Sequence, residues 1–257
     1  TPLYSSAASD VYKRQIQFKF SESSVEFDHQ NRMTGMSKKF QSSSMKMIEQ
    51  FMLEANETVA RHCVKRKLPA LYRVHQPPSD LKLQQLKKTL AHYGVNPKTV
   101  SLSDSYGFSR ILSHLKELPQ FEALQVVLLR SMALAVYQTR NGGHFGLAAE
   151  FYTHFTSPIR RYPDLMVHRA LKKELSSRNQ KKSSRKRNVK QKQGEEIDRE
   201  LALKCSQQER NAEKAELQSV DLMKCVFLEP HIGADFQSVV RSLDLSLIHI
   251  SEPTRPY

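Results

Sequence analysis

The sequence predicts an α+β fold that is mainly helical, with a short strand pair near its N-terminus. Apolar and polar residues alternate over residues 16–20 and again over residues 25–27, which favours two strands around a SESS turn. Most of the remaining chain repeats apolar residues every three or four positions, as amphipathic helices do. The strand pair therefore precedes a helical body.

The helices are expected in a fixed order between clear start and stop signals. Ser79 has the position of an N-cap, Gly94 that of a C-terminal stop, and Pro69 ends the preceding helix. An Asn-Gly-Gly break at residues 141–143 separates the earlier helices from the later ones. The predicted helices cover residues 45–65, 80–93, 108–118, 121–138, 163–175 and 195–223.

The most informative segment is HFGLAAEFYTHFTSPIRRYPDLMVHR at residues 144–169, which reads as a phosphate site. Thr156 and Ser157 offer hydroxyl donors, and Arg160 and Arg161 offer planar guanidinium groups that suit phosphate oxygens. Pro163 stands where proline favours a helix start, so the first helical amides would face the same anion. The simpler alternative is a solvated arginine pair ahead of an ordinary helix.

The same segment closely resembles a signature of the ribonuclease II and ribonuclease R family, the RNB-domain 3′-to-5′ exoribonucleases. Further stretches resemble family blocks in family order: MIEQFMLEAN, LPALYRVHQPPS, LLRSMALAVY and CSQQERNAE. The bacterial ribonuclease R branch is the most similar. The resemblance implies the C-terminal, mainly helical half of an RNB catalytic domain, from an enzyme that processively hydrolyses single-stranded RNA to 5′-mononucleotides.

The resemblance also implies roles for single residues. Arg160 matches the catalytic arginine that holds the scissile phosphate, with Thr156, Ser157 and Arg161 as RNA-binding neighbours. Phe18 matches an aromatic residue that stacks on the 3′-terminal base, and Glu49 a carboxylate that contacts the terminal ribose. Taken without the resemblance, Phe18 is a strand core residue and Glu49 belongs to a solvated helix face.

Hydrolysis in this family needs divalent metal, with Mg²⁺ expected for the intact enzyme. The family holds it with an aspartate cluster, and no DxxxxxDxDD-like pattern occurs in residues 16–244, so no metal ligand is assigned. His144, His154 and His168 lack a matching carboxylate or thiolate set and are expected to be core or loop histidines. We therefore expect this chain alone to be inactive.

The chain is expected to divide into four parts. Residues 10–15 and 245–250, DVYKRQ and LSLIHI, can be encoded by DNA stretches that are reverse complements. This favours non-native, adapter-derived segments at residues 1–15 and 245–257. Between them we expect a partial RNB domain at residues 16–223, with a basic insertion at 176–194, and the first strand of an OB-fold RNA-binding domain at 224–244.

A net charge of +14 points to a polyanionic partner, here single-stranded RNA. Ten Lys or Arg residues against one Glu lie in residues 172–192, and the absence of apolar periodicity over residues 176–194 predicts a disordered basic loop there. No apolar run is long enough for a bilayer, so we expect a cytoplasmic protein without a membrane partner; no obligate protein partner is inferable. The alternatives are a noncatalytic RNA-binding protein on the same scaffold and a basic helical module for DNA or membrane surfaces.

Overall fold

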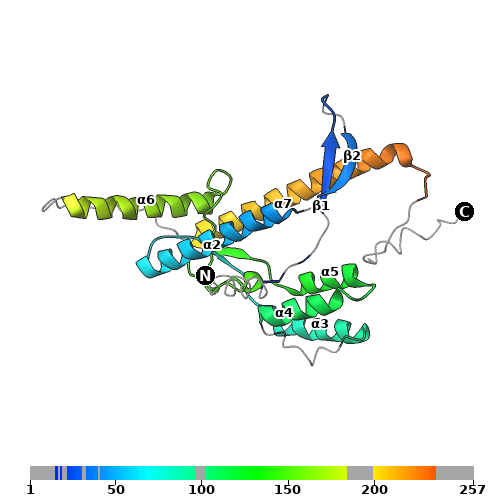
Figure 1. Cartoon of the computed structure of the whole chain (residues 1–257), viewed down its shortest axis with the longest axis horizontal. Helices are drawn as coiled ribbons and strands as arrows, with labels where there is room; N and C mark the ends of the chain where they lie inside the picture. Colours follow the sequence, from blue (N-terminus) through cyan, green and yellow to red (C-terminus); the bar gives the residue numbers. More distant parts are fainter. Residues whose placement is uncertain are drawn as a thin grey trace, which may run out of the picture.

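The computed structural model is mostly helical, with two small two-stranded sheets (Figure 1). It describes residues 15, 16, 18, 22–30, 33–39, 41–95, 102, 104–183 and 199–235. Among these residues no helix is long and apolar enough to cross a membrane. The predicted α+β class with helices in the majority is therefore confirmed, while the strands differ from the prediction.

The N-terminal sheet lies later in the chain than the alternation predicted. Strand β1 (Glu22–Phe27) pairs antiparallel with β2 (Met33–Lys39), so most of the predicted SESS turn is inside β1. Ile16 and Phe18 are outside any strand and pack against a helical cluster, and the amide of Ile16 donates to the carbonyl of Gly146 over 3.0 Å. The prediction of a strand there was wrong, because the alternating apolar residues pack on helices.

Two of the predicted helices match closely. Helix α2 (Ser43–Arg66) begins at the N-cap Ser42, whose hydroxyl accepts from the amide of Met45, and ends at Lys67 in the left-handed region. Helix α3 (Asp80–His92) begins after Ser79 as predicted. The chain turns at Gly94, where a φ of 75° is one that glycine adopts without strain.

The predicted helix over residues 121–138 is wrong in its second half. Helix α4 (Ser105–Leu115) is followed by α5 (Phe121–Ser131), and α5 ends when Met132 becomes extended. Strand β4 (Val136–Gln138) then pairs antiparallel with β3 (Tyr72–Val74). Residues 136–138 are extended because they pair with a strand distant in the chain, and the sequence of residues 132–138 does not indicate that partner.

The buried core has two main parts. Helices α3, α4 and α5 share one cluster, centred on Phe108, Leu90 and Leu128, which are fully buried. The second cluster joins the end of α2 to β3 and to Val167, which lies on α6 (Tyr162–Ser183). The small sheet β3–β4 therefore lies where α2 and α6 meet, beside helix α7 (Arg199–Leu228).

The later helices extend beyond their predicted ends. Helix α6 continues to Ser183, so residues 176–183 of the predicted disordered loop are helical, and residues 184–198 lie outside the described residues. Helix α7 continues to Leu228 and a 3-10 turn follows at Glu229–His231, where the OB-fold domain was expected to begin. The alternating apolar residues of the predicted OB strand, Phe236, Val239 and Val240, lie outside the described residues.

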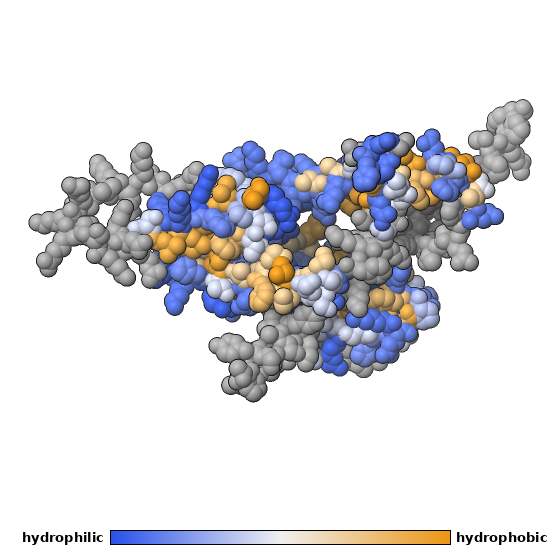
Figure 2. Space-filling view, turned by 45° about the horizontal axis from the view of Figure 1, so that its top comes forward, coloured by the Kyte–Doolittle hydropathy of each residue, from blue (hydrophilic) through white to orange (hydrophobic). Residues whose placement is uncertain are grey.

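Both long helices carry exposed apolar side chains. On α2 these include Met47, Ile48 and Phe51, and on α7 they include Leu203 and Leu217. Figure 2 shows apolar residues gathered in patches between polar ones on this face of the molecule. Such surface is more than single scattered residues, so parts of α2 and α7 have the character of contact surfaces.

Candidate functional site

The signature segment is attached to the small sheet by backbone hydrogen bonds. The amide of Arg73 in β3 donates to the carbonyl of Tyr152 over 3.0 Å, and Tyr72 forms a bridge with Thr153. The hydroxyl of Thr153, which is fully buried, donates to the carbonyl of Leu71 over 2.7 Å. Residues 152–153 thus extend the sheet and fix where the following loop starts.

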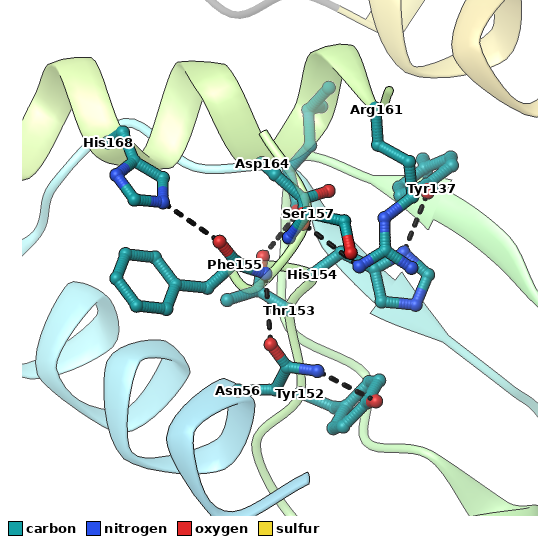
Figure 3. Close-up of polar contacts among 11 residues, drawn as sticks. Asn56, Tyr137, Tyr152, Thr153, His154, Phe155, Ser157, Arg161, Asp164 and His168 are labelled. Carbon is teal, nitrogen blue, oxygen red and sulfur yellow. Dashed lines mark hydrogen bonds and ion pairs between the residues drawn. The ribbon is translucent and has the colours of Figure 1, made fainter. Parts of the chain in front are cut away.

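A buried asparagine from α2 fixes the next part of the segment (Figure 3). The Asn56 amide nitrogen donates to the Tyr152 hydroxyl over 3.1 Å, and its oxygen accepts from the amide of Phe155 over 2.9 Å. On the other side, His168 of α6 donates to the carbonyl of Phe155 over 2.8 Å and stacks on its ring at 4.2 Å. Helices α2 and α6 therefore hold the loop between them.

Asp164, in the first turn of α6, binds Ser157 and Arg161 (Figure 3). Its carboxylate has no solvent exposure, and one oxygen accepts from the Ser157 amide at 2.8 Å and from the Arg161 guanidinium at 2.9 Å. Among the described residues, its second oxygen and Arg161 Nε are buried without a hydrogen-bond partner. An anion in the first turn of a helix is stabilised by the helix dipole, so Asp164 occupies a favourable position.

Arg160 differs from its neighbour because its side chain is exposed. Its amide donates to the carbonyl of Ser157 over 3.3 Å, as does that of Arg161 over 3.1 Å, so the backbone makes a tight turn before α6. Of the two adjacent arginines, Arg161 is held by the carboxylate of Asp164 and Arg160 faces outward.

Tyrosine and histidine side chains pack beside this loop. The Tyr137 hydroxyl and His154 Nδ1 share a hydrogen bond of 2.7 Å, and the Arg73 guanidinium lies 4.8 Å from the centre of the Tyr137 ring. Burial, with added repulsion from Arg161 and Arg73, lowers the pKa of His154 to about 3. Burial also raises the pKa of Tyr137 far above its usual value. Both groups are therefore neutral at physiological pH.

A second histidine pair fixes the entry to the segment. His75 accepts from the Gly146 amide at 2.9 Å and donates to the carbonyl of Ala133 at 2.8 Å, so both ring nitrogens are bound to backbone in the neutral form. His144 lies against it with ring centres 5.0 Å apart. Burial, followed by repulsion from His75, lowers the pKa of His144 to about 3. His144 is therefore a packed loop residue, as expected from the sequence.

The exposed arginine lines a cavity of about 720 Å³ between the loop and α7. The walls carry charges of both signs: Arg160, Arg161 and Lys204 against Glu209, Glu213 and Glu216. Glu209 forms an ion pair with Arg73, which connects α7 to β3. The cavity can receive a ligand with both anionic and hydroxyl groups, because cations and carboxylates line it together.

The two other predicted RNA contacts lie on different elements. Phe18 packs against the cluster of helices α3, α4 and α5. Glu49 is exposed near the start of α2, where its carboxylate accepts from the Gln41 amide over 2.6 Å. The local fold brings Thr156, Ser157, Arg160 and Arg161 together, while Phe18 and Glu49 are held by separate parts of the chain.

Sequence reasoning missed three residues that organise the site. Asp164 could have been found, because it lies three positions after Arg161 in a first helical turn. Asn56 and Glu209 gave no local signal, since their partners lie 99 and 136 positions away in the chain. In the part of the chain that the structure describes, no group of three or more His, Cys, Asp or Glu side chains gathers to hold a metal ion.

Comparison with known proteins identifies the family. The sequence model of the RNB-domain family matches residues 8–177, which is more than half of the chain. The chain belongs to the RNB-domain family. The match includes residues 8–15, so the assignment of residues 1–15 as non-native stays a prediction.

Sequence relatives are bacterial ribonucleases R. The chain is 36% identical to ribonuclease R of Aquifex aeolicus over 233 residues, which cover 88% of this chain and 31% of that protein. It is 35% identical to ribonuclease R of Escherichia coli, over 89% of this chain and 28% of that protein. The chain thus spans about a third of the length of these relatives.

Solved structures agree with the sequence comparison. The structure of Mycoplasma genitalium RNase R in complex with ribose methylated single-stranded RNA matches with a TM-score of 0.76 at 27% identity, covering 93% of this chain and 36% of that one. The complex of the same protein with double-stranded RNA matches with a TM-score of 0.75 at 28% identity, covering 92% and 41%. The arrangement of α2, α6 and α7 around the small sheet is therefore part of a ribonuclease R fold.

Proposed function

We propose that the chain is part of a processive 3′-to-5′ exoribonuclease that hydrolyses single-stranded RNA to 5′-mononucleotides in the cytoplasm. The observation that carries the proposal is that two adjacent arginines have different surroundings. Arg161 is held by the buried Asp164, and Arg160 is exposed in the wall of the cavity beside α7. A fixed loop that presents one free-facing guanidinium group suits recognition of a phosphodiester.

Within this proposal Arg160 is the catalytic residue. A guanidinium that stays charged and is positioned by a rigid loop stabilises the negative charge that develops on the scissile phosphate during attack. Arg161 positions that loop through its ion pair with Asp164. Thr156 and Ser157 lie half-buried on the same turn, where their hydroxyls can donate to neighbouring phosphate oxygens.

Phe18 and Glu49 are proposed contacts of the RNA 3′ end. The exposure of Glu49 on α2 supports contact with a ribose, since its carboxylate can accept from a 2′-hydroxyl in place of Gln41. Base stacking by Phe18 has weaker support, because its ring packs on the α3–α5 cluster. Both roles refer to the full-length protein.

Hydrolysis in the full-length protein is expected to use Mg²⁺, which would activate water and stabilise the leaving oxygen. The described residues do not fit a metal site: they hold no group of three candidate ligands, and the buried carboxylate of Asp164 is bound to Arg161. We therefore propose that this chain alone does not hydrolyse RNA.

The test uses the full-length protein and Arg160→Ala, with Arg130→Ala on the exposed surface of α5 as the matched control. The expected result is a fall in kcat of about 100-fold or more for Arg160→Ala, with a much smaller change in RNA affinity. Arg130→Ala should behave like the parent. Binding without any Mg²⁺-dependent release of mononucleotides by the full-length protein would instead favour the noncatalytic alternative.

A second test addresses the 3′ end. Glu49→Ala should lower the ratio of cleavage between oligonucleotides that end in ribose and in deoxyribose, because only ribose presents a 2′-hydroxyl. Gln41→Ala is the control, since it removes the partner of Glu49 but leaves the carboxylate. An unchanged ratio for Glu49→Ala would leave Glu49 as a solvated helix residue.

A further inference from the structure

A second groove lies on the other flank of α7 from the Arg160 cavity. It has a volume of about 920 Å³, and β4 with the residues after it forms one wall and α7 the other. Three arginines line it, Arg140 from the β4 side and Arg199 and Arg210 from α7. Among the described residues that line the groove there is no carboxylate, in contrast to the three glutamates of the Arg160 cavity.

Two of the arginines are spaced along α7. Arg199 and Arg210 are eleven positions apart on α7, which is about three helical turns. They therefore lie on the same face of the helix, about 16 Å apart along its axis. The guanidinium of Arg210 donates to the side-chain carbonyl of Gln207 over 2.9 Å, a partner that carries no charge.

A buried serine that lines the groove joins α7 to β4. The hydroxyl of Ser206, which is buried, accepts from the Tyr137 amide at 2.9 Å and donates to the carbonyl of Ala202 at 2.9 Å. This contact fixes α7 to β4, so the backbones that carry the arginines keep a set separation. The backbone of such a site need not rearrange when a ligand binds, although the exposed arginine side chains must still become ordered.

A neighbouring hollow continues the line of positive charge. It has a volume of about 520 Å³, shares Thr139 and Arg140 with the groove, and adds Lys67 from the end of α2. Among its described lining residues there is again no Asp or Glu. The cations thus run from α7 past the end of β4 to the end of α2.

We propose that this groove binds the phosphodiester backbone of single-stranded RNA, as a contact surface separate from the Arg160 cavity. Cations spaced along a groove match a ligand with regularly repeated negative charges, and arginine is well suited to phosphate oxygens. Such contacts add affinity without base specificity. The groove needs no hydrolysis, so it stands or falls independently of the exonuclease activity proposed above.

The test compares two triple variants of this chain that remove equal charge. Arg140→Gln, Arg199→Gln and Arg210→Gln empty the groove of cations, while Lys87→Gln, Lys88→Gln and Lys116→Gln remove three exposed cations from α3 and the end of α4. Fluorescence anisotropy with a labelled single-stranded 20-nucleotide RNA measures Kd over a range of salt concentrations. Circular dichroism checks that both variants keep the helical content of the parent.

The groove variant should bind RNA about tenfold or more weakly, and the slope of log Kd against log salt should fall by about 2 because three phosphate contacts are lost. The control variant should change Kd less than twofold. Equal weakening by both variants would overturn the proposal and leave only nonspecific attraction. Displacement of the RNA by poly-glutamate of the same charge, at the same concentration, would show a site for acidic peptides and would also overturn it.

Discussion

The loop before α6 and the N-terminal part of the chain were assigned by the same resemblance, yet the fold holds them in different ways. Around the loop, Asn56, Asp164 and His168 make buried or half-buried hydrogen bonds to the backbone. Glu49 and its partner Gln41 are exposed to solvent, and Phe18 is held by apolar packing. Polar contacts cost most when they are broken in a buried place, so the two regions should respond very differently to the same kind of change.

The largest expected effect is a loss of stability around the loop on acidification. Burial holds the pKa of His144 and His154 near 3, while an unfolded histidine titrates near 6.5. Between these values the unfolded chain binds more protons, so stability is complete above about pH 6.5 and falls as the pH drops towards 3. Each histidine contributes a slope of up to about 1.4 kcal/mol per pH unit.

Amide hydrogen exchange of Ser157 and Phe155 between pH 7 and pH 4.5, corrected for the intrinsic pH dependence of exchange, measures this loss. His154→Gln and His144→Gln should each flatten the corrected pH dependence, and His92→Gln on the exposed surface of α3 is the control. If His92→Gln flattened the curve as much as the two buried variants, the histidines beside the loop would not be its source.

Asp164→Ala should have the next largest effect. The substitution leaves the half-buried Arg161 guanidinium without its anion and the Ser157 amide without its acceptor, which costs about 3 kcal/mol. Exchange of the Ser157 amide should then become about a hundredfold faster. Asp164→Asn keeps an oxygen for that amide and should accelerate exchange less. Equal exchange rates in the parent and in Asp164→Ala would mean that the carboxylate does not fix the loop.

The sequence was informative wherever the signal was local. The extents of α2 and α3 and the helix that starts at residues 162–163 follow from neighbouring residues, and the structure contains them. Ser79 precedes α3 as predicted, but its side chain makes no cap hydrogen bond. The strands were mispredicted because β4 depends on pairing with β3, some sixty positions earlier, and because Ile16 and Phe18 pack on helices.

The candidate site divides in the same way. The signature placed Arg160, Arg161, Thr156 and Ser157 on one turn, since all four lie within six residues of chain. The sequence could not predict that Arg161 pairs with a buried carboxylate while Arg160 is exposed. That difference depends on the complete burial of Asp164, which results from the packing of α6 on α2 and β3.

Asn56→Ala should have a moderate effect of about 1 to 3 kcal/mol, because the Phe155 amide loses its acceptor in a partly buried place. Exchange of the Phe155 amide reports the change directly. Tyr152→Phe is the matched variant: it removes the other partner of Asn56 but keeps the bond to Phe155. Its effect on the Phe155 amide should be clearly smaller, and equal effects would contradict a direct role of Asn56 in holding the loop.

The smallest effect on stability is expected at the exposed pair of Gln41 and Glu49, near the start of α2. Gln41→Ala removes the hydrogen bond to Glu49, but both side chains are exposed and water replaces the lost partner. The free energy of unfolding of the full-length protein should change by less than about 0.5 kcal/mol. Ser42→Ala, one position later, is a useful contrast, because it removes the N-cap of α2 and should cost about 1 kcal/mol. A urea titration followed by circular dichroism separates the two, and a larger loss for Gln41→Ala than for Ser42→Ala would show that Glu49 is held structurally by Gln41 and is not available to a ribose.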